Sequence, residues 1–255
     1  RSNCTECNFI NNKIIAYGDI YHVGAGAISS PIWIKNCVFL NNSVQANTNE
    51  NYNTCFYGSS IYAFDTTIIE CTFDNNSAQN NFITKGGCVF ISQTASMTNC
   101  IFTNNIIYSF GESVFGGVIM SDSLEYSNSI IECKFVNNKI ISNNVNFSAN
   151  GEIIYIRDQS MTISNCLFET YLNGNSNSLS LIYFNTSRVN YYLTFTNNLV
   201  FFYNSINRTI FDGELYPNTK IRCIFNGNCI YPYNQQLFMN QSLTFINSTN
   251  SNEIA

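Results

Sequence analysis

The chain has 255 residues, of which 11% are charged and 45% are hydrophobic, and its formal net charge is −5. This length is ample for a hydrophobic core. The sequence has no basic patch with interleaved aromatic residues, which argues against a nucleic-acid partner, and no run of about 20 apolar residues that would predict a transmembrane segment. No motif predicts a cofactor. Because the chain opens at Arg1 without a methionine and reaches a repeat almost at once, we expect residues 1–255 to be a single repeat domain of a longer protein.

A short phrase, Cys-x-Phe, recurs along the chain, and in its first five copies a pair of Asn residues follows. Neighbouring copies begin roughly 30 residues apart, within the ~20–50-residue period of repeat proteins. The copies begin at Cys7, Cys37, Cys71, Cys100, Cys133, Cys166 and Cys223. In two further copies, LTFTNN and LTFINS, Leu193 and Leu243 take the cysteine position. About nine copies are enough to stack around a continuous core.

The segment before each cysteine predicts a strand that ends at a sharp corner. In PIWIKNCVFL, Ile32 and Ile34 share one face, and Cys37 and Phe39 share another. The step from Ile34 to Cys37 is odd, so only a bend at 35–36 lets both pairs point inward. The predicted corner residues are Glu6, Asn36, Glu70, Asn99, Glu132 and Asn165.

The repeated phrase itself predicts columns of identical side chains, because stacked coils place equivalent residues ~4.8 Å apart. The predicted inward column consists of Cys7, Cys37, Cys71, Cys100, Cys133, Cys166, Leu193 and Cys223. A column of stacked phenylalanines lies beside it, and Asn pairs such as 11–12, 75–76 and 137–138 form ladders.

A second phrase, a small-residue entry followed by an apolar pair, alternates with the first. It reads AGAI at 25–28, GSSI at 58–61, GGCV at 86–89, GGVI at 116–119 and GEII at 151–154. Strand-forming residues dominate both phrases, and helical patterns are nearly absent. A strand-only repeat of this length predicts an all-β fold, a right-handed single-stranded parallel β-helix of about nine coils.

The remaining cysteines do not follow the repeat. Cys4, Cys55 and Cys229 are off-pattern, and Cys223 with Cys229 is the candidate for a local disulfide. The Cys4-x-x-Cys7 spacing lacks a second ligand pair and His22 is the only histidine, so no metal site is predicted.

The two phrases resemble the Gly-Gly-Ala-(Ile/Leu/Val) and Phe-x-x-Asn tetrapeptides of polymorphic outer membrane protein repeats. The second tetrapeptide is seen as FINN from Phe9, FLNN from Phe39, FDNN from Phe73 and FVNN from Phe135. The resemblance implies a β-helical, extracellular or cell-surface protein of adhesive character. The richness in Asn, Ile, Tyr and Phe suits a protist with an AT-rich genome.

Two functions from different classes remain open. The first is a non-enzymatic surface module, an adhesin, display rod or filament subunit. Its partners would be neighbouring coils, copies stacked end to end, or host or matrix glycans and proteins. The second is a polysaccharide lyase or glycoside hydrolase, with Glu6, Glu70 and Glu132 as candidate catalytic groups, two coils or roughly 9.6 Å apart. The alternation of these carboxylates with Asn more simply keeps like charges off adjacent coils.

Other polar and aromatic residues have less specific interpretations. Asp65, Asp122, Asp158 and Asp212 are expected to cap turns. The aromatic runs 191–192 and 201–203 are expected in the core, whereas 231–233 could be core or surface. Candidate N-glycosylation sequons lie at Asn3, Asn146, Asn185, Asn207, Asn240 and Asn247, and two more, at Asn41 and Asn75, fall on ladder positions that could not be modified if they pointed inward.

Overall fold

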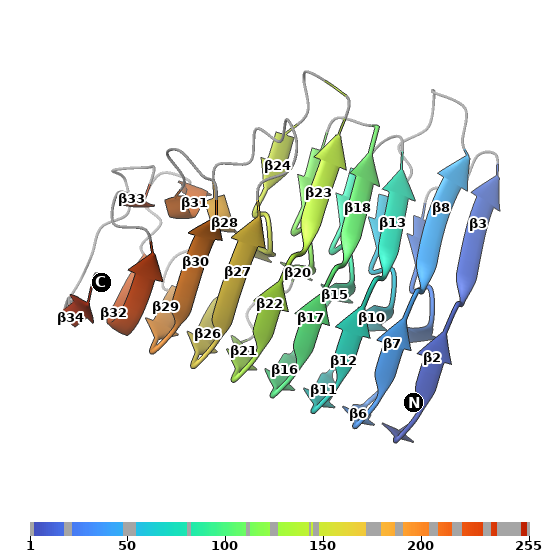
Figure 1. The fold of residues 1–255 in the computed structure, drawn as a ribbon, viewed down its shortest axis with the longest axis horizontal. Coiled ribbons are helices and arrows are strands. Elements are labelled where there is room, and N and C mark those ends of the chain that lie inside the picture. Colours follow the sequence, from blue (N-terminus) through green and yellow to red (C-terminus); the bar gives the residue numbers. More distant parts are fainter. Residues whose placement is uncertain are drawn as a thin grey trace.

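The computed structural model shows an all-β protein whose parallel strands stack into a β-helix (Figure 1). It describes residues 3–17, 22–47, 55–80, 83–110, 113–122, 127–142, 144, 148–171, 180–186, 191–203, 209–215, 221–231, 236–238 and 251–253. In the first coils the chain visits four sheets in a fixed order, and each coil adds two strands to the first sheet and one strand to each of the other three.

The first sheet has 16 strands in two arms that meet at β32 (Ile221–Tyr231), which also pairs with β34 (Ser251–Glu253). The first arm holds β1 (Asn3–Thr5), β6 (Trp33–Lys35), β11 (Thr66–Ile69), β16 (Ala95–Thr98), β21 (Ser127–Ile131), β26 (Ser160–Ser164) and β29 (Tyr191–Thr196). The second arm holds β2 (Asn8–Ile10), β7 (Val38–Leu40), β12 (Thr72–Asp74), β17 (Ile101–Thr103), β22 (Lys134–Val136), β27 (Leu167–Tyr171) and β30 (Leu199–Tyr203).

The other three sheets complete each coil. The second sheet holds β3 (Lys13–Tyr17), β8 (Ser43–Asn47), β13 (Ser77–Asn80), β18 (Ile106–Ser109) and β23 (Lys139–Ser142). The third holds β4 (His22–Gly24), β9 (Cys55–Tyr57), β14 (Ile83–Lys85), β19 (Ser113–Phe115) and β24 (Ser148–Asn150). The fourth holds β5 (Ile28–Ser29), β10 (Ile61–Ala63), β15 (Val89–Ile91), β20 (Ile119–Asp122), β25 (Ile154–Arg157), β28 (Ser180–Thr186), β31 (Thr209–Leu215) and β33 (Gln236–Phe238).

The predicted class is confirmed, but the predicted number of coils is wrong. The solenoid has about six turns rather than nine. The second and third sheets hold five strands each, and after β24 the described residues add no further strand to either of them. The copy predicted at Leu243 lies outside the described residues.

The corner that parity predicted is present in every regular coil. Asn36 has φ 52°, and its neighbours along the axis share this left-handed conformation, with Glu6 at 54°, Glu70 at 53° and Glu132 at 56°. The bend buries Ile34, Cys37 and Phe39 completely or almost so. Ile32, also expected inside, is instead 43% exposed.

A different corner lies between the third and fourth sheets, at the small-residue phrase. Gly86 has φ 66° and Gly116 has φ 70°. A Cβ atom on Gly116 would clash with the backbone carbonyl oxygen of Ile119. Glycine is therefore favoured there both by conformation and by the close approach of the chain to itself, although Ala25 occupies the equivalent position of the first phrase with φ 44°.

The core consists of the predicted columns. Phenylalanine rings stack nearly parallel along the second arm, with centroid separations of 4.8 Å for Phe9–Phe39, 4.7 Å for Phe39–Phe73 and 4.6 Å for Phe73–Phe102. The stack continues to Phe135 and Phe168 at 5.0 Å per step. Because neighbouring rings lie within 6° of parallel, the spacing of the coils sets the stacking distance.

The Asn pairs form two ladders, as predicted. The second Asn of each pair is inside: Nδ2 of Asn76 donates to Oδ1 of Asn105 at 3.0 Å, and Nδ2 of Asn105 donates to Oδ1 of Asn138 at 2.9 Å. The first Asn of each pair is outside, where Nδ2 of Asn75 donates to Oδ1 of Asn41 at 2.7 Å. Each amide thus links one coil to the next, in addition to the backbone ladder.

The register after Cys166 differs from the predicted column. Leu193 pairs with Met161, and Cys223 pairs with Leu193, so neither lies above Cys166. Asn198 takes that position, since its Oδ1 accepts from the backbone N of Cys166 at 2.9 Å. Asn228 follows, with its Oδ1 accepting from the backbone N of Asn198 at 2.9 Å.

The shift is possible because an Asn pair fits either of two corners of the coil: the corner after the phenylalanine, as at Asn75–Asn76, or the corner before the cysteine position. Asn197 has φ 55°, the same value as Asn165, so the pair in LTFTNN occupies the corner and the cysteine position. Phe195 consequently pairs with Ile163 rather than with Phe168. Buried Asn side chains are accommodated because each finds the amide of the next coil as a partner.

The candidate disulfide is not formed. All eleven cysteines are free, Cys223 and Cys229 included. Cys223 is buried opposite Leu193, whereas Cys229 pairs with Leu199 beyond the corner at Gly227. The two thiols therefore belong to different arms of the first sheet.

Candidate functional site: an aromatic groove

The outward side of the fourth sheet carries a column of large side chains. They follow the apolar pair of each small-residue phrase and pair in register from coil to coil. The column consists of Tyr62, Phe90, Met120, Tyr155 and Tyr183. Because successive residues of a strand point to opposite faces, the inward Ile or Val before each of them forces it outward.

The corner at the small-residue phrase lets this column meet outward side chains of the third sheet. Tyr57, at the end of β9, contacts Phe90 edge-on at 4.6 Å and Tyr62 at 5.9 Å. Phe115, at the end of β19, contacts Tyr155 edge-on at 5.0 Å. The result is a second, smaller apolar cluster outside the main core, which we call the aromatic groove. Phe90, Met120, Tyr155 and Tyr183 are buried in it, and the half-buried rings of Tyr57, Tyr62 and Phe115 are its accessible part.

Charged side chains converge on the same groove. Nε of Arg157 lies 2.8 Å from Oδ1 of Asp122, its register partner on the adjacent strand. The ammonium of Lys85 lies 5.3 Å from the centre of the Tyr57 ring, within the range of a cation–π contact. Burial raises the pKa of the Asp122 carboxyl above its ordinary value, although Arg157 and Lys85 act to lower it. Asp158 adds a further negative charge that raises the same pKa.

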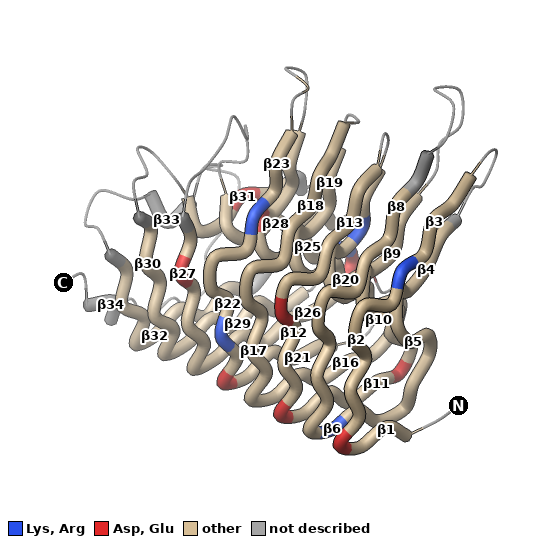
Figure 2. The backbone as a smooth tube through the Cα atoms, turned by 45° about the vertical axis from the view of Figure 1, so that its right-hand side comes forward, with Lys and Arg blue, Asp and Glu red and all other residues tan. Residues whose placement is uncertain are grey.

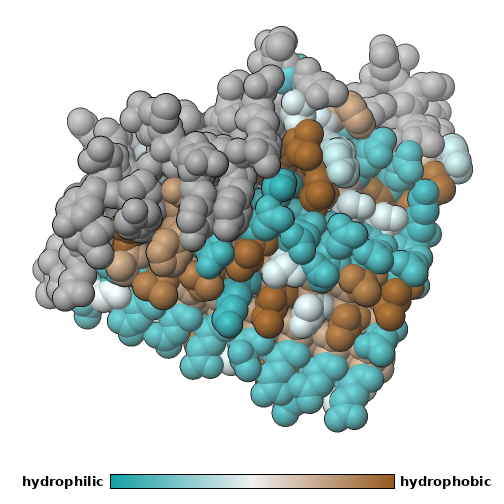
Figure 3. All heavy atoms as spheres, in the orientation of Figure 1, coloured by the Kyte–Doolittle hydropathy of each residue, from teal (hydrophilic) through white to brown (hydrophobic). Residues whose placement is uncertain are grey.

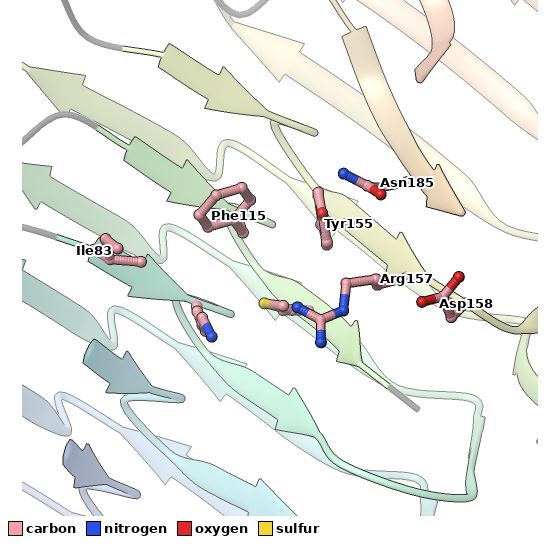
Figure 4. Close-up of a pocket in the computed structure, with 8 residues that line it drawn as sticks. Ile83, Phe115, Tyr155, Arg157, Asp158 and Asn185 are labelled. Carbon is pink, nitrogen blue, oxygen red and sulfur yellow. The ribbon is translucent and has the colours of Figure 1, made fainter. Parts of the chain in front are cut away.

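Two hollows make up the groove. One, of about 410 Å³, is lined by residues that include Lys85, Phe115, Tyr155 and Arg157. The other, of about 510 Å³, is lined by Tyr57, Tyr62, Phe90, Ser92, Gln93, Asp122 and Arg157. They share Arg157 and extend over neighbouring coils, so they form one elongated site. Figure 4 shows the guanidinium of Arg157 extending into the first hollow, with Phe115 and Tyr155 on one side and Asp158 also in the lining.

The carboxylates singled out from the sequence lie elsewhere. Glu6, Glu70 and Glu132 are exposed at the corner between the two arms of the first sheet. Oε2 of Glu70 is 3.8 Å from Nζ of Lys35. In Figure 2, acidic residues recur along the lower edge of the solenoid, and charged residues are sparse over the rest of the view. Figure 3 likewise shows hydrophilic residues gathered along this edge. The two hollows of the groove contain none of these three glutamates.

The four aspartates expected at turns have mixed roles. Asp65 and Asp158 do occupy left-handed corners, with φ 54° and 51°. Oδ1 of Asp212 accepts from the backbone N of the next residue at 2.8 Å. Asp122 differs, because it ends strand β20 and pairs with Arg157 in the groove.

The aromatic runs expected in the core are only partly there. Tyr191 and Phe202 are buried, but Tyr192 is 49% exposed. Phe201 is half-buried. Of the run 231–233, only the backbone of residue 231 is described.

The sequons divide by placement. Asn3 is exposed, and Asn185 is half-buried at the margin of the first hollow. Asn41 and Asn75 belong to the outer ladder and are exposed. They do not point inward, so burial does not prevent their modification. Four further sequons, Asn146, Asn207, Asn240 and Asn247, lie outside the described residues.

The off-pattern cysteines take ordinary places in the repeat. Cys4 pairs with Ile34 and Cys55 pairs with Ile83. Among the described residues, no group of three or more His, Cys, Asp or Glu side chains could hold a metal ion. In that same part of the chain, there is no helix with the length and apolar character needed to cross a bilayer.

The groove was missed from the sequence, although a signal for it exists. The tripeptides IYA, VFI and IYI at residues 61–63, 89–91 and 154–156 look like continuous apolar core strands. Their middle residue is aromatic in each case, and it falls at the outward position once the preceding residue is fixed inward. A regular aromatic residue at a position of outward parity is the signal that could have identified the groove.

Comparisons with known proteins add no name to this geometry. No protein-family model, no curated protein and no solved structure matches the chain.

Proposed function

We propose that this chain is a non-enzymatic β-helical module of an extracellular or cell-surface protein, which adheres to glycans through the aromatic groove. The observation that carries the proposal is an elongated, aromatic-lined hollow on the outside of a rigid stack of coils. Concave sites with apolar walls and a few convergent polar groups are the usual form of ligand sites. Sugar rings match such walls, since their C–H faces pack on aromatic rings and their hydroxyls bond to polar groups.

The scaffold is rigid, which suits a binding site that does not change conformation. The groove residues sit on strands whose neighbours are fixed by backbone ladders, by the Asn ladders and by stacked rings. A rigid element positions binding groups more accurately than a loop does. The display of such a rod outside the cell follows from the resemblance to surface repeat proteins.

Binding of the whole chain to a panel of immobilised polysaccharides tests the proposal. Tyr62→Ala and Phe115→Ala should each weaken binding about tenfold, because each removes a ring that is half-buried in the free protein and would be covered by ligand. Trp33→Ala is the matched control, since Trp33 is a 43% exposed aromatic on the first sheet and should not affect binding. Absence of binding to every polysaccharide, or equal loss in the control, would contradict the proposal. Antibody access to the chain on intact cells tests its location.

A polysaccharide-cleaving enzyme is the second candidate. Its one supporting observation is that Asp122, whose pKa is raised, lies in the groove close enough to Asp158 to be affected by its charge. A protonated and an ionised carboxyl are the pair that glycoside hydrolysis uses. The ion pair with Arg157 opposes this role by stabilising ionised Asp122. Release of reducing ends from a bound polysaccharide, abolished in Asp122→Asn, would favour the enzyme over the adhesive module.

A further inference from the structure

The charge of the groove is unusual for this molecule. The whole chain has only 11 Lys and Arg residues, against 16 Asp and Glu. Two of the cations, Lys85 and Arg157, nevertheless line the same hollow of about 410 Å³. Both act on the pKa of Asp122, so both lie near this carboxylate.

Two cations, Lys85 and Arg157, and two carboxylates, Asp122 and Asp158, meet in this cluster, so its formal charges balance. Asp122 is paired with Nε of Arg157. A guanidinium has further N–H groups on its other two nitrogens, which are suited to a second, planar acceptor. Asp158, the other carboxylate, is buried and contributes to the lining of the same hollow. Lys85 is half-buried and stands over the Tyr57 ring.

The aromatic walls stand next to these cations. Phe115 and Tyr155 line the same hollow as Lys85 and Arg157, and Tyr57 and Tyr62 line the adjoining one. A ligand that fits both features needs a ring with an apolar face and a negative group at its edge. A sugar that carries a carboxylate or a sulfate has this combination.

We propose that the groove selects acidic saccharides, with Arg157 and Lys85 holding the carboxylate or sulfate of one sugar unit while its ring packs against the aromatic wall. The inference rests on the proposed function and specifies the ligand class of the same site. Charge-assisted hydrogen bonds from a guanidinium to an oxyanion are about twice as strong as neutral ones. The carboxylate or sulfate of the sugar therefore determines the selectivity for acidic over neutral saccharides. Contacts with the aromatic rings contribute equally to the affinity for both.

The test is isothermal titration of the whole chain with a uronic-acid oligosaccharide and with the same oligosaccharide after reduction of its carboxyl groups to alcohols. A sulfated neutral oligosaccharide forms a third arm, which separates carboxylate from sulfate recognition. We expect the acidic forms to bind at least about tenfold more tightly than the reduced form, with the preference falling as salt rises from low to molar concentration.

Three variants locate the effect. Arg157→Gln should lose about tenfold to a hundredfold in affinity for the acidic form and little for the reduced form. Lys85→Gln provides a second measurement in case Arg157→Gln folds poorly because Asp122 loses its partner. It should also reduce the ratio of the affinity for the acidic form to the affinity for the reduced form. Lys134→Gln is the matched control, because Lys134 is an exposed cation on β22 in the first sheet.

The outcomes separate this inference from the proposed function. Equal binding of the acidic and reduced forms would overturn the inference and leave a glycan-binding module. A preference that survives in both Arg157→Gln and Lys85→Gln, or that Lys134→Gln abolishes, would also overturn it. If Tyr62→Ala and Phe115→Ala leave all binding unchanged, the groove is not the site and both proposals fail.

Discussion

A cysteine at the first position of each phrase is small enough to lie inside a narrow coil and polar enough to bond there. Sγ of Cys37 lies 3.2 Å from the backbone oxygen of Lys35, and Cys71 and Cys166 repeat this contact at 3.2 and 3.3 Å. The thiol thereby donates to a corner carbonyl that also accepts a backbone N–H from the adjacent coil. This accounts for the preference for cysteine over a larger aliphatic residue.

The thiols of the native protein should be unreactive apart from those near the surface. Burial raises the pKa of Cys88 and of Cys223 to about 12, so the reactive thiolate is scarce at pH 8. Thiol titration of the native chain should detect at most the four half-buried cysteines, which are Cys4, Cys7, Cys55 and Cys229. The unreduced chain in denaturant should titrate at eleven. A count near one in denaturant would show that the cysteines are paired.

The corner carboxylates offer a test of backbone strain. Glu132 adopts φ 56°, a conformation that Asn and Gly enter more readily than a long side chain does. Glu132→Asn should therefore raise the free energy of unfolding, by about 0.5–1 kcal/mol. The reverse change one coil along, Asn165→Glu, should lower it by a similar amount, and it also places a second negative charge beside Glu132. Urea denaturation of both variants measures the effect, and a loss of stability in Glu132→Asn would refute it.

At the scale of elements, the inner Asn ladder should contribute far more than the outer one. Asn105 is buried, and its Oδ1 accepts from the backbone N and from Nδ2 of Asn76, both at 3.0 Å. Its own Nδ2 donates to the carbonyl of Phe73 at 2.9 Å. Asn105→Ala should lower the free energy of unfolding by about 2–4 kcal/mol, since buried groups on two coils lose their partners.

Asn104→Gly is the matched control in the outer ladder. Asn104 is exposed and donates to Oδ1 of Asp74 at 2.9 Å. Glycine keeps its left-handed φ of 55°. The cost should stay below about 1 kcal/mol, because water replaces the lost partner. Equal destabilisation by Asn104→Gly and Asn105→Ala in denaturant melts would mean that burial does not distinguish the two ladders.

The elements also show what the sequence could and could not specify. The corner at Asn36 was predictable, because side-chain parity leaves one arrangement that puts Ile34 and Cys37 inside. The register at Leu193 was not, because LTFTNN fits two positions in the coil and only the partners of Asn198 decide between them. The groove escaped prediction for a related reason, since the contact of Tyr155 with Phe115 depends on a corner whose angle the sequence does not state.

At the scale of the whole molecule, the N-terminal end of the solenoid differs from its middle. The strands β1 to β5 each pair with one neighbour among the described residues, because each is the terminal strand of its sheet path (Figure 1). Their outer edges carry backbone donors and acceptors that no described strand satisfies. The core columns are uncovered at the same end, as Phe9 is half-buried while Phe39 beneath it is fully buried.

An edge of this kind is a template for another strand of the same geometry. We therefore expect the isolated 255-residue chain to associate through this edge, with a second copy adding its coils to the open ladders at a rise of ~4.8 Å per coil. Sedimentation velocity should show a mass that rises with concentration. Phe9→Lys places a charge on the end of the core and should keep the chain monomeric, because a second copy would have to bury that charge. Ile101→Lys is the matched control, since Ile101 is 37% exposed on the side of the rod and a charge there leaves the end free to associate. A chain that stays monomeric at millimolar concentration, or that associates equally well as Phe9→Lys, does not use this end as an interface.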